Sequence, residues 1–187
     1  MRLQTNFQLA EFTKTAWNKL DKRTQIQLIA LANTLQAIRT AIGRPIVVSS
    51  GVRSLDDYKR LQTQGLNPSA TSDHFFGAEV PRTNSAPYKL ALGAADIVCP
   101  SMPAVEFYNF IAKMRYEGKI QTGQLLLEKN KTMWLHIANH PDPFLLPEEK
   151  VQRTERSLGG MGYSLDNGKT FTWLNQAKRE LLPIGLK

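Results

Sequence analysis

The chain has 187 residues, enough for one domain with its own hydrophobic core, or for one domain plus a short extension. Its apolar and charged content is ordinary for a globular protein, which excludes a disordered chain, and no apolar run approaches the roughly 20 residues of a membrane span. The formal net charge of +8 suits a polyanionic partner such as nucleic acid, anionic lipid or an anionic cell wall. Because the basic residues are scattered and no nucleic-acid motif accompanies them, we do not expect specific nucleic-acid binding.

The N-terminus and the single cysteine add two further expectations. The first residues, Met1 to Asn6, lack the apolar stretch of a secretory signal, so we expect a protein made in the cytoplasm without a signal peptide. Cys99 is the one cysteine of the chain, which excludes an internal disulfide and a multi-cysteine metal site. We interpret it as a small buried apolar residue, with a reactive thiol as the alternative.

The first half of the chain begins with Asn6–Phe12, which we expect to form an ordered arm with two aromatic anchors. Apolar residues then recur at helical spacing from about Asp21 to Ile42, which predicts an amphipathic helix. Gly43 and Pro45 are typical of a helix end, since glycine adopts the left-handed cap and proline cannot continue the helix. The following Ile46–Ser49 predicts a short, largely buried strand.

The second half of the chain continues with helices and strands joined by polar segments. Ser54 is a suitable cap for a second helix, and residues 64–71 have the composition of a loop. The further expected elements are a strand at 94–98, a helix that opens at Ser101 and Pro103 and ends near Gly118, and strands at 124–128 and 133–138.

The character of the sequence changes after about residue 143. Charged residues at 148–156 give way to a glycine-rich stretch at 159–162. Two short β-prone segments then flank Asp166-Asn167-Gly168, which is a hairpin signal. We therefore expect a main domain at 1–143 and a C-terminal extension at 144–187 that contains a hairpin.

Three polar residues are candidate metal ligands. In the predicted strand at 133–138, alternation points Trp134 and His136 the same way, and His74 lies in a loop before a tight turn. Taken singly, each histidine also has a structural interpretation. Asp96 lies in an apolar strand, where a buried carboxylate needs a partner such as a metal, although a helix cap or a salt bridge remains an alternative. Two histidines and a carboxylate are ligands typical of hydrolytic zinc sites. We assign His140 to a loop.

Five segments in register resemble a known family. They are Phe7–Thr13, Ser49-Ser50-Gly51-Val52-Arg53-Ser54, Ser72-x-His74 with its glycine turn, Ala94-Ala95-Asp96-Ile97, and Gln124–Glu128 followed by Trp134-x-His136. Together they are similar to the zinc D-Ala-D-Ala carboxypeptidase and L-Ala-D-Glu endopeptidase family, in its small single-domain carboxypeptidase branch. The resemblance runs from about residue 3 to 140.

The resemblance implies an α+β fold in which a small antiparallel sheet is flanked by helices, as in hedgehog-like and D-Ala-D-Ala-peptidase-like domains. It implies a Zn²⁺ ion held by His74, Asp96 and His136, and hydrolysis of peptidoglycan stem peptides. Arg53 would be a catalytic and substrate-binding residue that steadies an oxyanion or a substrate carboxylate, with a structural ion pair as the alternative. Ser72 would bind substrate or fix its loop.

The sequence departs from the family pattern at two places. The family motif is usually Ser-x-His-x-x-Gly-x-Ala-x-Asp, whereas here 21 residues lie between His74 and Asp96, so about 15 residues near 78–92 are inserted. Both halves of the motif survive, and loop-closure entropy grows slowly with length, so we expect the insertion to loop out at the cleft rim as a lid or a partner contact. Glu79 is a fallback ligand inside it. Many relatives also carry an acid at the position of Met133, and we expect Glu128 across the turn to act as the general base instead, with a solvated strand-end glutamate as the alternative.

Two functions therefore follow from the sequence. The first is a zinc metallopeptidase of the bacterial cell wall, for example a bacteriophage lysin or a tail-associated component that opens the wall, because family members are frequent in phages. The second is a non-catalytic subunit of a phage tail or baseplate that keeps the fold and contacts other tail proteins. In either case we expect the protein to act at the cell wall or to be carried in a virion.

Overall fold

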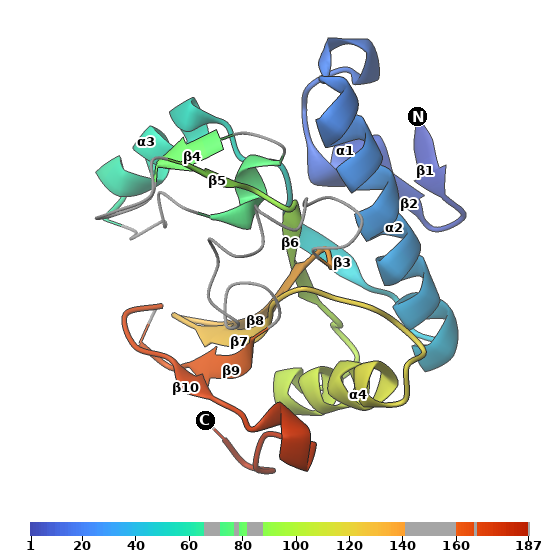
Figure 1. Cartoon of the computed structure of the whole chain (residues 1–187), viewed down its shortest axis with the longest axis vertical. Coiled ribbons are helices and arrows are strands. Elements are labelled where there is room, and N and C mark those ends of the chain that lie inside the picture. Colours follow the sequence, from blue (N-terminus) through green and yellow to red (C-terminus); the bar gives the residue numbers. More distant parts are fainter. Residues whose placement is uncertain (66–71, 77–78, 82–87, 141–159, 167, 187) are drawn as a thin grey trace.

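The computed structural model describes residues 1–65, 72–76, 79–81, 88–140, 160–166 and 168–186. The helices are α1 (Leu9–Phe12), α2 (Lys22–Ile42), α3 (Leu55–Thr63) and α4 (Ala104–Tyr116), with 3₁₀ helices at Trp17–Lys19, Asp73–Phe75 and Gln176–Lys178. The strands are β1 (Arg2–Gln4), β2 (Phe7–Gln8), β3 (Val47–Ser50), β4 (Glu79–Pro81), β5 (Tyr88–Leu90), β6 (Ala94–Val98), β7 (Leu125–Lys129), β8 (Met133–Ala138), β9 (Met161–Ser164) and β10 (Thr172–Trp173). Figure 1 shows the central strands between the helices, as the predicted α+β class requires.

A six-stranded sheet in the order β10-β9-β7-β8-β6-β3 forms the centre of the fold. The pairs are antiparallel except β7 with β9, which run parallel, so the expectation of an antiparallel sheet is wrong for this pair. β8 runs antiparallel to β7 and returns the chain to the end of the sheet at which β7 begins, so β9 starts from that end and runs parallel to β7. The sheet is therefore mixed.

The predicted helix at 21–42 is confirmed as α2, and both of its ends are set by local signals. The Asp21 carboxylate accepts a hydrogen bond from the Thr24 N–H at 2.9 Å, and Gly43 closes the helix with φ of 64°. The buried positions Leu28, Leu31, Leu35 and Ile38 recur at helical spacing and face the sheet.

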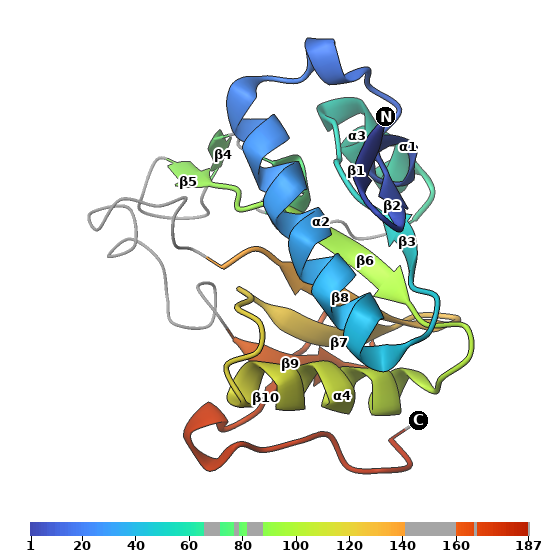
Figure 2. The same ribbon diagram turned by 90° about the vertical axis from the view of Figure 1, so that its right-hand side faces the viewer.

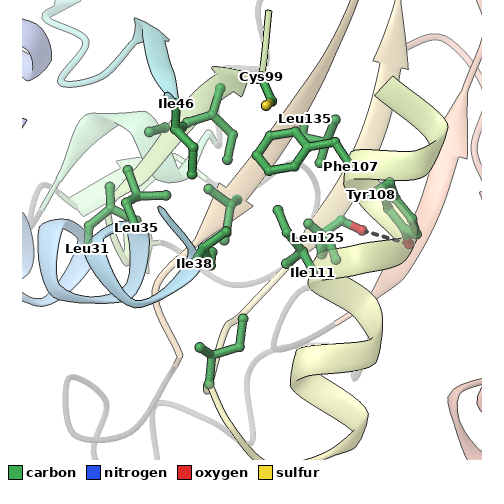
Figure 3. Close-up of a cluster of buried hydrophobic side chains, with 14 of the residues drawn as sticks. Leu31, Leu35, Ile38, Ile46, Cys99, Phe107, Tyr108, Ile111, Leu125 and Leu135 are labelled. Atoms are coloured by element: carbon green, nitrogen blue, oxygen red, sulfur yellow. Dashed lines mark hydrogen bonds between the residues drawn. The ribbon is translucent and has the colours of Figure 1, made fainter. Parts of the chain in front are cut away.

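The core lies between one face of the sheet and the helices α2 and α4. Figure 2 shows these helices crossing the same face of the strands, and Figure 3 shows their side chains meeting those of the sheet. Along β6, β7 and β8 alternate residues point into this core, namely Ala95, Ile97, Leu125, Leu127, Leu135 and Ile137. The residues between them point to the opposite face. Cys99 is buried in the same core, which confirms its interpretation as a small apolar residue.

The strand predicted at 46–49 is observed one residue later, as β3, and the expectation that it is largely buried is wrong. Ile46, just before the strand, is buried, but Val47 is 45% exposed. The reason is that β3 is the last strand of the sheet order and has β6 as its neighbour on one side. The predicted N-terminal arm is ordered, and both of its aromatic anchors, Phe7 and Phe12, are buried.

The insertion and the extension both contain paired strands. In the insertion, β4 pairs antiparallel with β5, while its residues 82–87 lie outside the described part of the chain. In the extension, the predicted hairpin is confirmed as the antiparallel pair β9–β10, which adds to the central sheet beside β7. The charged stretch at 148–156 lies outside the described residues. Among the described helices, none has both the length and the apolar character of a membrane span.

Candidate metal centre

The split motif of the sequence closes in space. Asp96 and His136 are direct partners in the β6–β8 register, so both side chains leave the same face of the sheet. His74 reaches them from the 3₁₀ helix Asp73–Phe75. The two histidines are buried, and the side chain of Asp96 is 15% exposed.

The ligand atoms of these three residues form a nearly equilateral triangle. His74 Nε2 lies 3.1 Å from Asp96 Oδ1 and 3.2 Å from His136 Nδ1, and His136 Nδ1 lies 3.2 Å from Asp96 Oδ1. One nitrogen or oxygen from each side chain therefore points at a common centre, close enough to hold a metal ion.

The orientation of His74 is set by a backbone carbonyl. Its Nδ1 lies 2.7 Å from the carbonyl oxygen of Gly51, and an N–H at this position donates to that oxygen and leaves Nε2 with a free lone pair. Gly51 is required because a Cβ there would lie 2.4 Å from the carbonyl oxygen of Phe12. The N–H of Arg53 also donates to the carbonyl of His74 at 2.8 Å. The N-terminal arm thus supports the segment that orients the first ligand.

The start and the end of the insertion are held by buried polar side chains that the sequence analysis missed. At its start, the Thr24 hydroxyl donates to the Phe76 carbonyl at 3.0 Å. At its end, Gln27 donates to the Ala91 carbonyl at 2.9 Å, and the Asp73 carboxylate accepts from the Leu92 N–H at 2.9 Å. These hydrogen bonds hold the two ends of the insertion in place next to the start of β6.

Asn139 completes this clamp from the end of β8. Its side-chain amide donates to the Leu92 carbonyl at 2.8 Å and to the Gln27 carbonyl at 3.0 Å, and its backbone N–H donates to Gly93 at 2.9 Å. A buried asparagine with its donors used in this way fixes three segments at once. Its signal in the sequence is weak, because each partner is distant along the chain.

The close packing of the three candidate ligands shifts the pKa values of Asp96 and His136. Burial alone would raise the pKa of Asp96, but the adjacent imidazoles of His74 and His136 outweigh it and hold the pKa well below its usual range. For His136, burial would lower the pKa, but the hydrogen bond and charge of Asp96 raise it. The group therefore behaves as an anion between two imidazoles, which is an environment that attracts a cation.

The three ligands lie in an open cleft of about 1100 Å³ on the sheet face opposite the core. The predicted site residues Arg53, Ser72 and Glu128 also line this cleft, together with Trp134. The Ser72 hydroxyl accepts a hydrogen bond from the His74 N–H at 3.3 Å, which supports the interpretation that it fixes the loop. Burial lowers the pKa of Arg53 and outweighs the nearby carboxylates of Asp96 and Glu128, which act in the opposite direction.

Glu128 shares the sheet face of His136. It pairs with Trp134 in the β7–β8 register, while its neighbour Leu126, two residues back, pairs with His136, so Glu128 is diagonal to the ligand. The pKa of Glu128 is raised, mainly by burial and also by the negative charge of Asp96, which together outweigh the opposing effect of His136. Met133 pairs with Lys129 and packs against the core, so an acidic side chain at position 133 would point toward the core and away from the cleft.

One further candidate lies outside the cluster, and the side chain of another lies outside the described part of the chain. His140 follows β8 in a loop and does not belong to the described group of side chains that could hold a metal ion, as expected. Glu79 lies in β4, and its side chain falls outside what the structure describes.

Comparisons of the chain with protein-family models, with curated proteins and with solved structures found no match. The similarity of its motifs to a zinc peptidase family therefore stays a prediction. Function has to be inferred from the site itself.

Proposed function

We propose that this protein is a zinc-dependent metallopeptidase that hydrolyses stem-peptide bonds of the bacterial cell wall. The observation that carries the proposal is the closure of His74, Asp96 and His136 around one point, with Glu128 on the same face of an open cleft. A structural metal site is usually enclosed by four protein ligands, whereas three ligands at the floor of a cleft are typical of a catalytic site.

The donor set fits zinc. Zinc holds nitrogen and oxygen ligands at about 2.0–2.2 Å in tetrahedral geometry, which places ligand atoms about 3.3–3.6 Å from each other. The observed separations of 3.1 to 3.2 Å need a small expansion to reach this range. Two imidazoles with one carboxylate also favour zinc over magnesium or calcium, which prefer oxygen ligands alone.

The chain supplies the remaining groups of a hydrolytic site. A bound zinc ion would lower the pKa of a coordinated water to about 7 and would polarise the substrate carbonyl. Glu128 then acts as general base, and the environment that raises its pKa makes it a better proton acceptor than an ordinary glutamate. Arg53 provides a fixed positive charge beside Asp96 and Glu128, suited to an oxyanion or to a substrate carboxylate.

The charge of the protein supports a cell-wall substrate. The net charge of +8 favours approach to a wall that carries carboxylates and other anionic polymers. The lining of the cleft carries both signs of charge, with Lys14 and Lys131 beside the acids Glu11 and Asp57. The two lysines are available to pair with the free carboxylates of a stem peptide.

The test is digestion of purified sacculi by the zinc-loaded protein, followed by mass mapping of the released fragments. We expect wild type to cut stem peptides, and Glu128→Gln to lower the rate about 10²–10⁴-fold with zinc still bound. Glu117→Gln is the matched control, because Glu117 pairs with Lys119 on the surface and does not line the cleft. Metal analysis should show loss of zinc in both His74→Ala and Asp96→Ala.

The alternative function is a non-catalytic subunit of a phage tail or baseplate that retains the metal. On this alternative the wild-type protein binds zinc but leaves the stem peptides intact. Intact stem peptides with zinc bound would therefore reject the peptidase. Detection of the chain in purified virions would then test the tail location.

A further inference from the structure

The C-terminal hairpin β9–β10 forms one wall of the cleft, on the side of the sheet order away from the ligand-bearing strands β6 and β8. Phe171 and Trp173 stack with ring centroids 5.6 Å apart and planes inclined by 28°. Both side chains are half-buried, and both line the cleft. The extension therefore adds an aromatic surface to the cavity that contains the candidate metal centre.

A continuous floor joins this aromatic pair to the ligands. The sheet register places Trp173 opposite Gly162, Gly162 opposite Leu126, and Leu126 opposite His136. Three strand spacings of about 4.8 Å separate Trp173 from His136, a span of about 14 Å. Since the two residues between them are a glycine and a leucine, the floor is uncharged and low along this line.

The hairpin is fixed in place beside Glu128. The Asp166 carboxylate accepts hydrogen bonds from the Thr170 N–H at 2.9 Å and from the Ser164 hydroxyl at 2.8 Å, which closes the turn. Gly168, within this turn, lies against Glu128, because a Cβ on it would be 3.6 Å from Glu128 Oε2 and 3.9 Å from the Phe171 ring. The aromatic wall is thus continuous with the proposed base.

The segment after β10 is anchored along α4. Leu182 exchanges two hydrogen bonds with the side chain of Asn109, at 2.8 and 2.9 Å, and the Tyr116 hydroxyl donates to the Glu180 carbonyl at 2.9 Å. Because both ends of the hairpin are held, the aromatic pair has a defined position relative to the ligands. A preformed surface of this kind is expected of a binding subsite.

We propose that Phe171 and Trp173 form a subsite for a sugar ring of the glycan strand that carries the stem peptide. The apolar C–H face of a pyranose packs against exposed aromatic faces, while its hydroxyl and amide groups need polar neighbours. Asn130 and Thr132 line the same cleft and supply such groups. The span of about 14 Å corresponds to about four residues of extended peptide between sugar and metal centre. The inference rests on the proposed wall substrate.

The experiment measures sugar binding without hydrolysis. The full chain is titrated with an N-acetylglucosamine tetramer, and separately with a sugar-free stem tetrapeptide, while the three tryptophan indole signals are followed by NMR. We expect the tetramer to shift the signals of Trp134 and Trp173 and to leave that of Trp17, which does not line the cleft. Trp173→Leu and Phe171→Leu should each weaken tetramer binding about tenfold or more.

Phe110→Leu is the matched control, because Phe110 is a half-buried ring on α4 that does not line the cleft, and its tetramer binding should equal that of wild type. The proposal is overturned if the tetramer does not bind wild type, or if both cleft variants bind it as wild type does. It is also overturned if these variants weaken only the sugar-free peptide, since the pair would then hold an apolar peptide side chain. Tetramer binding by a protein that leaves sacculi intact would reject the peptidase and keep the sugar subsite, and the reverse result would reject the subsite alone.

Discussion

The ring of Phe76 packs against Gly93, so the last described residue before the insertion contacts the residue that directly follows the insertion. A Cβ on Gly93 would lie 2.8 Å from Cε1 and 2.9 Å from Cδ1 of Phe76. Phe76 is buried, with 2% exposure. This contact holds the two halves of the ligand motif together, because His74 precedes Phe76 by two residues and Asp96 follows Gly93 by three.

The first prediction concerns Gly93→Ala. Gly93 has φ of 84°, where alanine costs about 1–2 kcal/mol, and the added methyl group would also collide with the Phe76 ring. We expect a loss of at least about 2 kcal/mol in the free energy of unfolding and weaker metal binding, measured by urea unfolding and metal titration. Gly118→Ala is the control, because Gly118 has φ of 71° with no atom within 4 Å of the added Cβ. Equal losses in the two variants would contradict the proposed role of the contact.

The second prediction concerns the asparagine clamp. Asn139→Ala removes the donors to the carbonyls of Leu92 and Gln27 and leaves buried acceptors without them, which should cost about 2–3 kcal/mol of unfolding free energy. Metal affinity should fall as well, because β6 carries Asp96. Asn109→Ala also removes two hydrogen bonds, but to the C-terminal segment, so metal affinity should be unchanged there. Unaltered metal affinity in Asn139→Ala would show that β6 is positioned without the clamp.

The parts of the fold that sequence predicts well are those with local signals. Asp21 and Gly43 mark the ends of α2, and the turn between β7 and β8 is polar, so these boundaries were correct to within a residue or two. The parallel pairing of β9 with β7 and the edge position of β3 depend on which strands meet. That choice is made by packing between distant segments and leaves no local trace.

The candidate site divides in the same way. The three ligands carry motif signals, and hairpin reasoning placed Glu128 on the ligand face because pairing register follows from a short turn. The residues that close the motif across its insertion were missed. Gln27 and Asn139 act through backbone groups 47 to 112 positions away along the chain, and nothing in their neighbourhoods marks them.

The third prediction concerns Arg53→Lys. A lysine keeps the charge but loses the planar guanidinium that lies beside Asp96 and Glu128, so the substitution is not conservative here. We expect kcat/KM on stem peptides to fall about 10–100-fold, with zinc content unchanged. Arg44→Lys is the control, because Arg44 is exposed and bonds the Ser101 carbonyl away from the cleft. Zinc loss in Arg53→Lys would instead indicate a structural ion pair with Asp96.

The last prediction is the pH dependence of stability, which should change sign when zinc is bound. In the zinc-free protein the pKa of His136 is raised above its ordinary value of 6.5, so its stabilising pair with Asp96 is fully present below pH 6.5 and is lost as pH rises through the folded-state pKa. The pKa of Asp96 is lowered from 3.8, so its contribution is present above pH 3.8 and is lost only in stronger acid. Zinc-free stability should therefore decline above pH 6.5.

Zinc reverses this trend because the ligands must be deprotonated to bind it. Zinc affinity should rise with pH over the range in which His136 loses its proton, and stabilisation by bound zinc rises with it, to about 4 kcal/mol when free zinc exceeds Kd a thousandfold. Urea unfolding at a series of pH values, with zinc and with a chelator, measures both curves. In His136→Gln the zinc-free decline above pH 6.5 should disappear. A decline that persists in this variant would show that a group other than His136 causes the pH dependence of the zinc-free protein.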